Sequence, residues 1–126
     1  MEEVNFISGW IGFLFGALSG AGMGIFFHSP AWLGGYDSFP RRMIRLGHIS
    51  FYGLGTMNIL YALSVANRPL PLSQSHVASS LFVIGLVTMP ACCFLTAWKK
   101  PFRHLFPLPV FSITGAISIC SFGWIN

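Results

Sequence analysis

The sequence predicts an all-α integral membrane protein with four transmembrane helices, and three observations support this fold class. First, 54% of the 126 residues are hydrophobic and only 8% are charged, whereas soluble domains carry about 25% charged residues. Second, the mean hydropathy is +0.69. Third, turn-forming and charged residues divide the chain into four apolar runs, each close to the roughly 20 residues that span a bilayer. We therefore expect a single membrane domain over residues 1–126.

The first apolar run, residues 6–27, predicts a transmembrane helix that carries a packing seam. Glycine recurs in it at every fourth position, at Gly12, Gly16, Gly20 and Gly24. A helix with 3.6 residues per turn places these positions along one side, and small residues at this spacing let two backbones touch in lipid. The seam is longer than one helix crossing needs, so we expect part of it to pack against a partner chain. The acidic start of the chain is unlike the positive region of a signal peptide, so we expect this helix to be retained.

Turn-forming residues delimit the other three predicted helices, at residues 43–66, 75–98 and 107–125. The second helix follows Asp37 and Ser38, either of which is a suitable N-cap, with Pro40 tolerated in the first turn. Pro90 lies inside the third helix and is expected to interrupt it. The connections are short, so we expect consecutive helices to be neighbours.

Lysine and arginine are distributed unequally between the connections. Six of the seven lie in the first and third connections, at Arg41, Arg42, Arg45, Lys99, Lys100 and Arg103. The second connection holds only Arg68. Short loops rich in lysine and arginine stay on the cytoplasmic side, so we predict that both termini face outside (N-out, C-out). We expect an inner (cytoplasmic) membrane or another energy-converting membrane.

The same six basic residues form a belt at the predicted cytoplasmic surface. They account for the net charge of +4, so binding to nucleic acid is not expected. Their role in topology is a sufficient explanation by itself. A second hypothesis is that they bind anionic lipid headgroups, since arginine donors match phosphate oxygens well.

His48 lies inside the second predicted helix, and it suggests a cofactor. A b-type haem needs one axial imidazole from each of two facing helices, and the second ligand would be His104 or His28. Neither of these lies inside a predicted span at the depth of His48. The alternative is an interfacial histidine that hydrogen-bonds a carbonyl or a headgroup. We therefore keep a b-type haem as a hypothesis and assign no cofactor.

Cys92 and Cys93 suggest a different activity, because thiolates bind soft cations such as Hg(II) or Cu(I). The pair resembles the paired cysteines in helices of the small mercury-uptake membrane proteins, which would imply soft-metal transport. The resemblance covers this one dipeptide. Adjacent residues on a helix point about 100° apart, and buried cysteine commonly serves as a small apolar residue.

The leading hypothesis is a non-catalytic accessory subunit of a larger energy-converting membrane complex, respiratory or photosynthetic. The chain is small, and its only acidic residues are Glu2, Glu3 and Asp37, which lie outside the predicted spans. Its glycine seam is also longer than one helix crossing within the protein requires. No hydrolase, kinase, nucleotide or zinc motif is present, so we do not expect an enzyme. The expected partners are other membrane subunits and anionic lipids. An electron-transport subunit with haem and a soft-metal transporter are the two alternatives.

Overall fold

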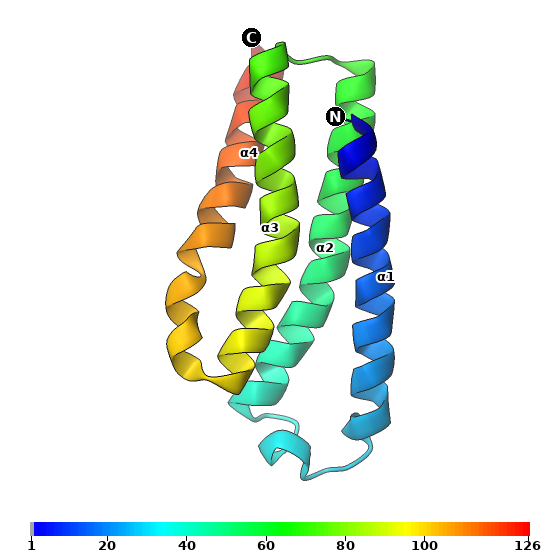
Figure 1. The fold of residues 1–126 in the computed structure, drawn as a ribbon, viewed down its shortest axis with the longest axis vertical. Helices are drawn as coiled ribbons and strands as arrows, with labels where there is room; N and C mark the ends of the chain where they lie inside the picture. The colour runs from blue at the N-terminus through cyan, green and yellow to red at the C-terminus, as the bar shows by residue number, and fades with distance from the viewer. Residues whose placement is uncertain (1) are drawn as a thin grey trace.

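The computed structural model describes residues 2–126 and contains four long helices (Figure 1). They are α1 (Glu2–Phe27), α2 (Phe39–Asn67), α3 (Leu72–Trp98) and α4 (Pro107–Ile125). All four are long and apolar enough to cross a membrane, which confirms the predicted fold class. Two short 3₁₀ helices, η1 (Trp32–Gly34) and η2 (Lys100–Leu105), lie in the first and third connections.

The helix ends differ from the prediction by a few residues, for local reasons. α1 begins at Glu2, because carboxylates in a first turn interact favourably with the positive end of the helix dipole. Ser38 is the N-cap of α2, and its Oγ accepts a hydrogen bond from the backbone N–H of Arg41 at 3.4 Å. α3 continues through Pro90 without a break, because neighbouring groups in a membrane bundle can compensate for the lost backbone bond.

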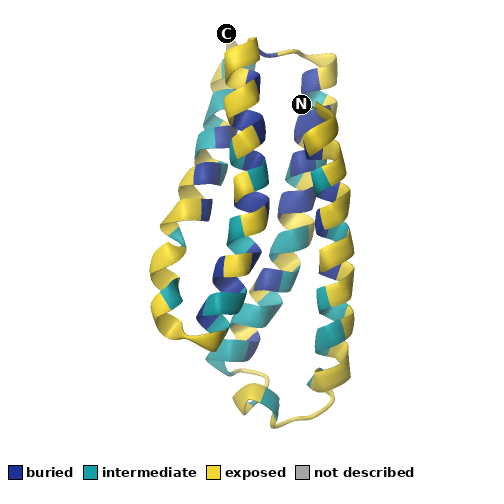
Figure 2. Cartoon of the chain, viewed as in Figure 1, coloured by how far each residue is buried: buried dark blue, intermediate teal, exposed yellow. Residues whose placement is uncertain are grey.

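The four helices form an open row rather than a closed bundle. α1 packs along α2, α2 along α3 and α3 along α4, while α1 touches α3 to a smaller extent. α1 and α4 therefore lie at opposite ends of the row (Figure 1). Figure 2 shows that both outer helices are mostly exposed. Only 11% of the apolar stretch is buried in α1 and 22% in α4, against 33% in α2 and 44% in α3.

A buried polar cluster joins the first three helices. Asn5 on α1 donates from Nδ2 to Asn58 Oδ1 on α2 at 2.8 Å and to the carbonyl of Ser79 on α3 at 3.2 Å. The Ser79 hydroxyl donates back to Asn5 Oδ1. Asn58 donates to the carbonyls of Leu54 at 2.9 Å and Phe82 at 3.2 Å. The two asparagines are 0% exposed and Ser79 is 3% exposed, so this cluster is buried.

The glycine seam of α1 faces α2, and its closest contact lies one turn earlier than predicted. A Cβ built on Gly9 would lie 2.6 Å from the Gly55 carbonyl oxygen, so the two backbones touch there. Further along, Gly16 and Gly20 make room for the rings of Tyr52 and His48. These rings separate the two helices, and a Cβ added at Gly24 would have nothing within 4 Å of it. Gly24 is therefore outside the internal seam.

Replacing Asn58 by Ala should lower the free energy of unfolding by about 1–2 kcal/mol, because one N–H of the buried Asn5 side chain loses its acceptor. The matched control is Asn67→Ala, since Asn67 is exposed and bonds only the Leu63 carbonyl of its own helix, at 2.7 Å. The measurement is unfolding in mixed micelles with increasing SDS. Equal losses in both variants would contradict a structural role for the cluster.

Gly9→Ala should destabilise the protein by about 1–3 kcal/mol, because the new methyl group collides with the backbone of α2. Gly24→Ala is the control on the same helix, and it should be neutral or raise stability by up to about 1 kcal/mol through helix propensity. Thermal unfolding in a mild detergent measures both. A Gly24→Ala variant that is as unstable as Gly9→Ala would show that the seam extends further than Gly20.

Candidate functional site

His48 lies half-buried on α2 and is held against the glycine seam of α1. Its Nδ1 is 3.0 Å from the hydroxyl oxygen of Ser19 on α1. Its ring stands edge-on to Tyr52 on the next turn of α2, with ring centroids 5.4 Å apart. Gly20 provides the space, since a Cβ there would lie 2.7 Å from the His48 ring. Groups from both helices thus fix the orientation of the imidazole.

The ring nitrogen of His48 that carries the proton depends on the hydrogen bonds of Ser19. Ser19 Oγ donates to the Gly16 carbonyl at 2.9 Å, and a hydroxyl has only one proton to donate. In that arrangement Ser19 accepts from His48, with the ring proton on Nδ1, whereas a hydroxyl turned to donate to Nδ1 places the ring proton on Nε2. A neutral imidazole protonated at Nδ1 has its lone pair on Nε2. Histidines that ligate metals are commonly oriented by a hydrogen bond from the other nitrogen in this way.

The structure does not bring the other candidate haem ligands to His48. His104 is exposed in η2, which packs mainly against α3 and α4, whereas His48 faces α1. His28 is also exposed and follows α1, nine residues beyond Ser19, which corresponds to about 13 Å along a helix axis. Over residues 2–126, no group of three or more His, Cys, Asp or Glu side chains is placed to hold a metal ion.

The cysteines are packed as small apolar side chains. Cys92 and Cys93 are 4% and 0% exposed, and Cys120 on α4 is 5% exposed. Cys93 lies against Gly47 of α2, whose Cβ would be 3.1 Å from the cysteine Cβ. Cys120 belongs to a separate apolar cluster with Tyr61 and Ala116. All three are free thiols.

The two basic segments meet at one end of the molecule, where α2 begins and α3 ends (Figure 1). The ammonium of Lys100 lies 5.1 Å from the centroid of the Phe39 ring, which joins η2 to the start of α2. Arg45 packs 4.1 Å from the Tyr36 ring and donates to the Tyr36 carbonyl at 2.8 Å. The exposed members of the predicted belt are Arg42, Lys99, Lys100 and Arg103.

Arg41 differs from the rest of the predicted lipid-binding belt because it is buried, with 2% of its surface exposed. Its Nε donates to the Trp32 carbonyl at 2.6 Å, and its Nη2 donates to the Ser29 carbonyl. Its guanidinium also lies 4.9 Å from the Phe27 ring centroid and 5.5 Å from that of Trp32. Arg41 therefore organises the α1–α2 connection and is turned away from any headgroup.

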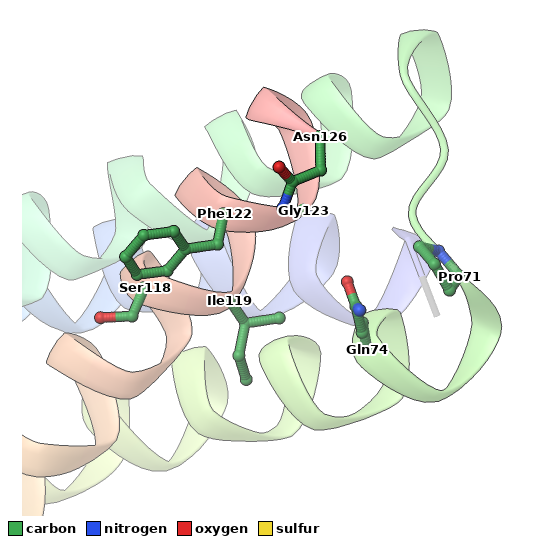
Figure 3. A pocket seen from close by; sticks show the side chains of 7 residues that line it. All are labelled: Pro71, Gln74, Ser118, Ile119, Phe122, Gly123 and Asn126. Carbon is green, nitrogen blue, oxygen red and sulfur yellow. The ribbon is translucent and has the colours of Figure 1, made fainter.

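A hollow of about 500 Å³ lies between the start of α3 and the end of α4 (Figure 3). Its lining contains no catalytic groups. Its lining consists of Pro71, Gln74, Ser118, Ile119, Phe122, Gly123 and Asn126. The Ser118 hydroxyl donates to the Thr114 carbonyl of its own helix at 2.8 Å. None of the lining side chains is an acid, a base or a cysteine, so the hollow offers no general acid–base chemistry.

Three residues that the sequence pattern did not single out shape these sites. Asn5 lies just before the predicted first helix, and Ser79 is one of several serines in the third. From the sequence, Ser19 is one more small residue of the seam, although its hydroxyl is hydrogen-bonded to His48 Nδ1. A polar side chain inside or beside an apolar run was the available signal, because such groups bond across helices in membranes.

The fold defines a polytopic α-helical membrane protein. Comparisons of the chain with protein-family models, with curated proteins and with solved structures find no match.

Arg41→Gln should loosen the segment from residue 28 to residue 38, because two carbonyls and two aromatic rings lose their cationic partner. We expect a stability loss of about 2 kcal/mol and faster amide hydrogen exchange in that segment, measured by mass spectrometry in detergent. Arg42→Gln removes the same charge from an exposed neighbour and should change neither quantity. If the two variants behave alike, the role assigned to Arg41 is wrong.

Proposed function

We propose that the chain is a non-catalytic structural subunit of a larger membrane complex, which it joins through the outer face of α1. The observation that carries this proposal is a second line of small residues on α1 that the internal seam does not use. Ala17, Ala21 and Gly24 are exposed, and nothing lies within 4 Å of a Cβ position on Gly24. Spacings of four and three residues place them on one helix face.

Such a face is suited to a transmembrane helix of another subunit. In lipid there is no hydrophobic force between helices, so association depends on close backbone approach at small residues. The open row also supports a partner here, because α1 has neighbours on one side only and 11% of its apolar stretch is buried. A respiratory or photosynthetic complex remains the prediction from the sequence, as does placement in an inner or other energy-converting membrane.

The proposed orientation has the basic end of the molecule in the cytoplasm and both termini outside. Its support is the gathering of the two basic segments at one end of the row (Figure 1), which the positive-inside rule assigns to the cytoplasmic face. The opposite end carries Arg68 together with the acidic residues Glu2 and Glu3.

The experiment is purification of a C-terminally tagged copy in mild detergent, followed by identification of the co-purifying chains. We expect a stoichiometric set of membrane subunits with the wild type and a several-fold smaller yield of them with Gly24→Leu. Gly53→Leu is the matched control, because Gly53 is exposed on α2 and also has nothing within 4 Å of its Cβ position. Recovery of the chain alone, or as a homo-oligomer, would contradict the proposal.

A second candidate is an electron-transfer subunit in which His48 is an axial ligand of a b-type haem. The observation in its favour is the hydrogen bond between Nδ1 and Ser19, which orients the ring and, when Nδ1 is the donor, leaves the lone pair on Nε2. Because His28 and His104 do not face His48, the second ligand would come from a partner helix. A reduced-minus-oxidised absorption spectrum of the purified assembly tests this, with a b-type signal that is lost in His48→Ala and kept in His104→Ala.

The soft-metal hypothesis for Cys92 and Cys93 stays a prediction.

A further inference from the structure

An apolar groove of about 340 Å³ opens on the side of the molecule where α1 and α3 pass over α2. It exists because α1 lies close to α2 but touches α3 much less. Gly12 of α1 allows the groove to be deep, since a Cβ there would lie 3.0 Å from Leu86 of α3. Apolar side chains of all three helices form its walls, including Ile11, Phe15, Phe51, Val87, Ala91 and Phe94.

The face of α3 that lines the groove continues to Trp98, which lies beside the cationic side chain of Lys99. Val83, Val87, Ala91 and Phe94 follow one another at helical spacing, and the next residue on that face is Trp98. Trp98 is 70% exposed, and the ammonium of Lys99 lies 4.6 Å from the centroid of its ring. Phe102 stacks on the same tryptophan with centroids 6.2 Å apart. Trp98 lies four residues after Phe94, the last groove residue on α3, which is about 6 Å, or one turn, along the helix axis.

The size and charge of this surface favour one class of occupant. A helix with side chains is about 10–12 Å wide and would not enter a groove bordered by phenylalanine and valine, whereas a single acyl chain would. Tryptophan is typical of the headgroup region of a bilayer, and lysine binds phosphate as a point charge. Lys100 and Arg103 are exposed on the neighbouring turn, and no acidic residue follows Asp37 in the chain. The side chains that follow Lys99 in η2 therefore add positive charge and no negative charge.

We infer that this surface binds an anionic diacyl phospholipid, with one acyl chain in the groove and the phosphate beside Lys99. The groove supplies the apolar contact, Trp98 lies at the depth of the glycerol and headgroup, and the ammonium neutralises the phosphate. The surface uses none of the side chains that hold His48. It is also independent of the proposed subunit role.

The experiment is lipid rebinding to the delipidated full chain in detergent, followed by native mass spectrometry with phosphatidylglycerol and phosphatidylcholine. We expect phosphatidylglycerol to bind about fivefold more tightly, since one lysine near the surface contributes about 1 kcal/mol with an anionic lipid. Lys99→Gln should remove that preference. Ala91→Phe should reduce the binding of both lipids, because the ring fills the groove.

Two controls separate this site from general effects of charge and volume. Arg68→Gln removes a cation at the other end of the molecule, and Ser121→Phe fills a different groove, between α2 and α4. Both should bind the two lipids as the wild type does. Ala91, Lys99 and Ser121 are exposed, so these variants are expected to fold. Equal binding of the two lipids by the wild type, a preference that survives in Lys99→Gln, or unchanged binding in Ala91→Phe would each overturn the inference.

Discussion

The hydrogen bonds among Asn5, Asn58 and Ser79 determine how the first three helices are placed relative to one another. Inside a bilayer, sliding one apolar helix along another gains or loses little, because lipid is as apolar as the side chains. An amide without a partner in that environment is costly. The three polar residues satisfy one another in the observed register, in which Gly9 meets Gly55, and Gly16 and Gly20 contact the rings of Tyr52 and His48.

Much of this fold could be predicted from the sequence, because span number and length follow from composition and the bilayer thickness. The glycine spacing also predicted a seam on α1. The limits of that seam could not be predicted: Gly24 has the same spacing as Gly20, but the rings of Tyr52 and His48 separate the helices before it is reached. The open row was also unpredictable, since short connections make consecutive helices neighbours and do not decide whether the first meets the last.

For the site residues too, the sequence gives the residue type, whereas only the structure shows the burial and the partners of each side chain. Arg41 and Arg42 are identical in type and adjacent in sequence, yet one is enclosed by carbonyls and rings of the α1–α2 connection and the other is exposed. His48 can be identified from the sequence as an ionisable group within a span, which is a functional hypothesis by default. The hydrogen-bond partner of its Nδ1 is Ser19, 29 positions away in the chain, and only the packing of α1 on α2 shows it.

The open row also has a consequence for the order in which the molecule is built. The buried polar cluster needs α1, α2 and α3 alone. In contrast, α4 is held by apolar packing on α3 and on Tyr61 and Val65 of α2, and by two hydrogen bonds between Arg68 and Trp124 at its far end. Chains are synthesised from the N-terminus, and early segments generally fold first. The first three helices can therefore reach their final register while α4 is still on the ribosome. The last helix then joins a scaffold that is already assembled.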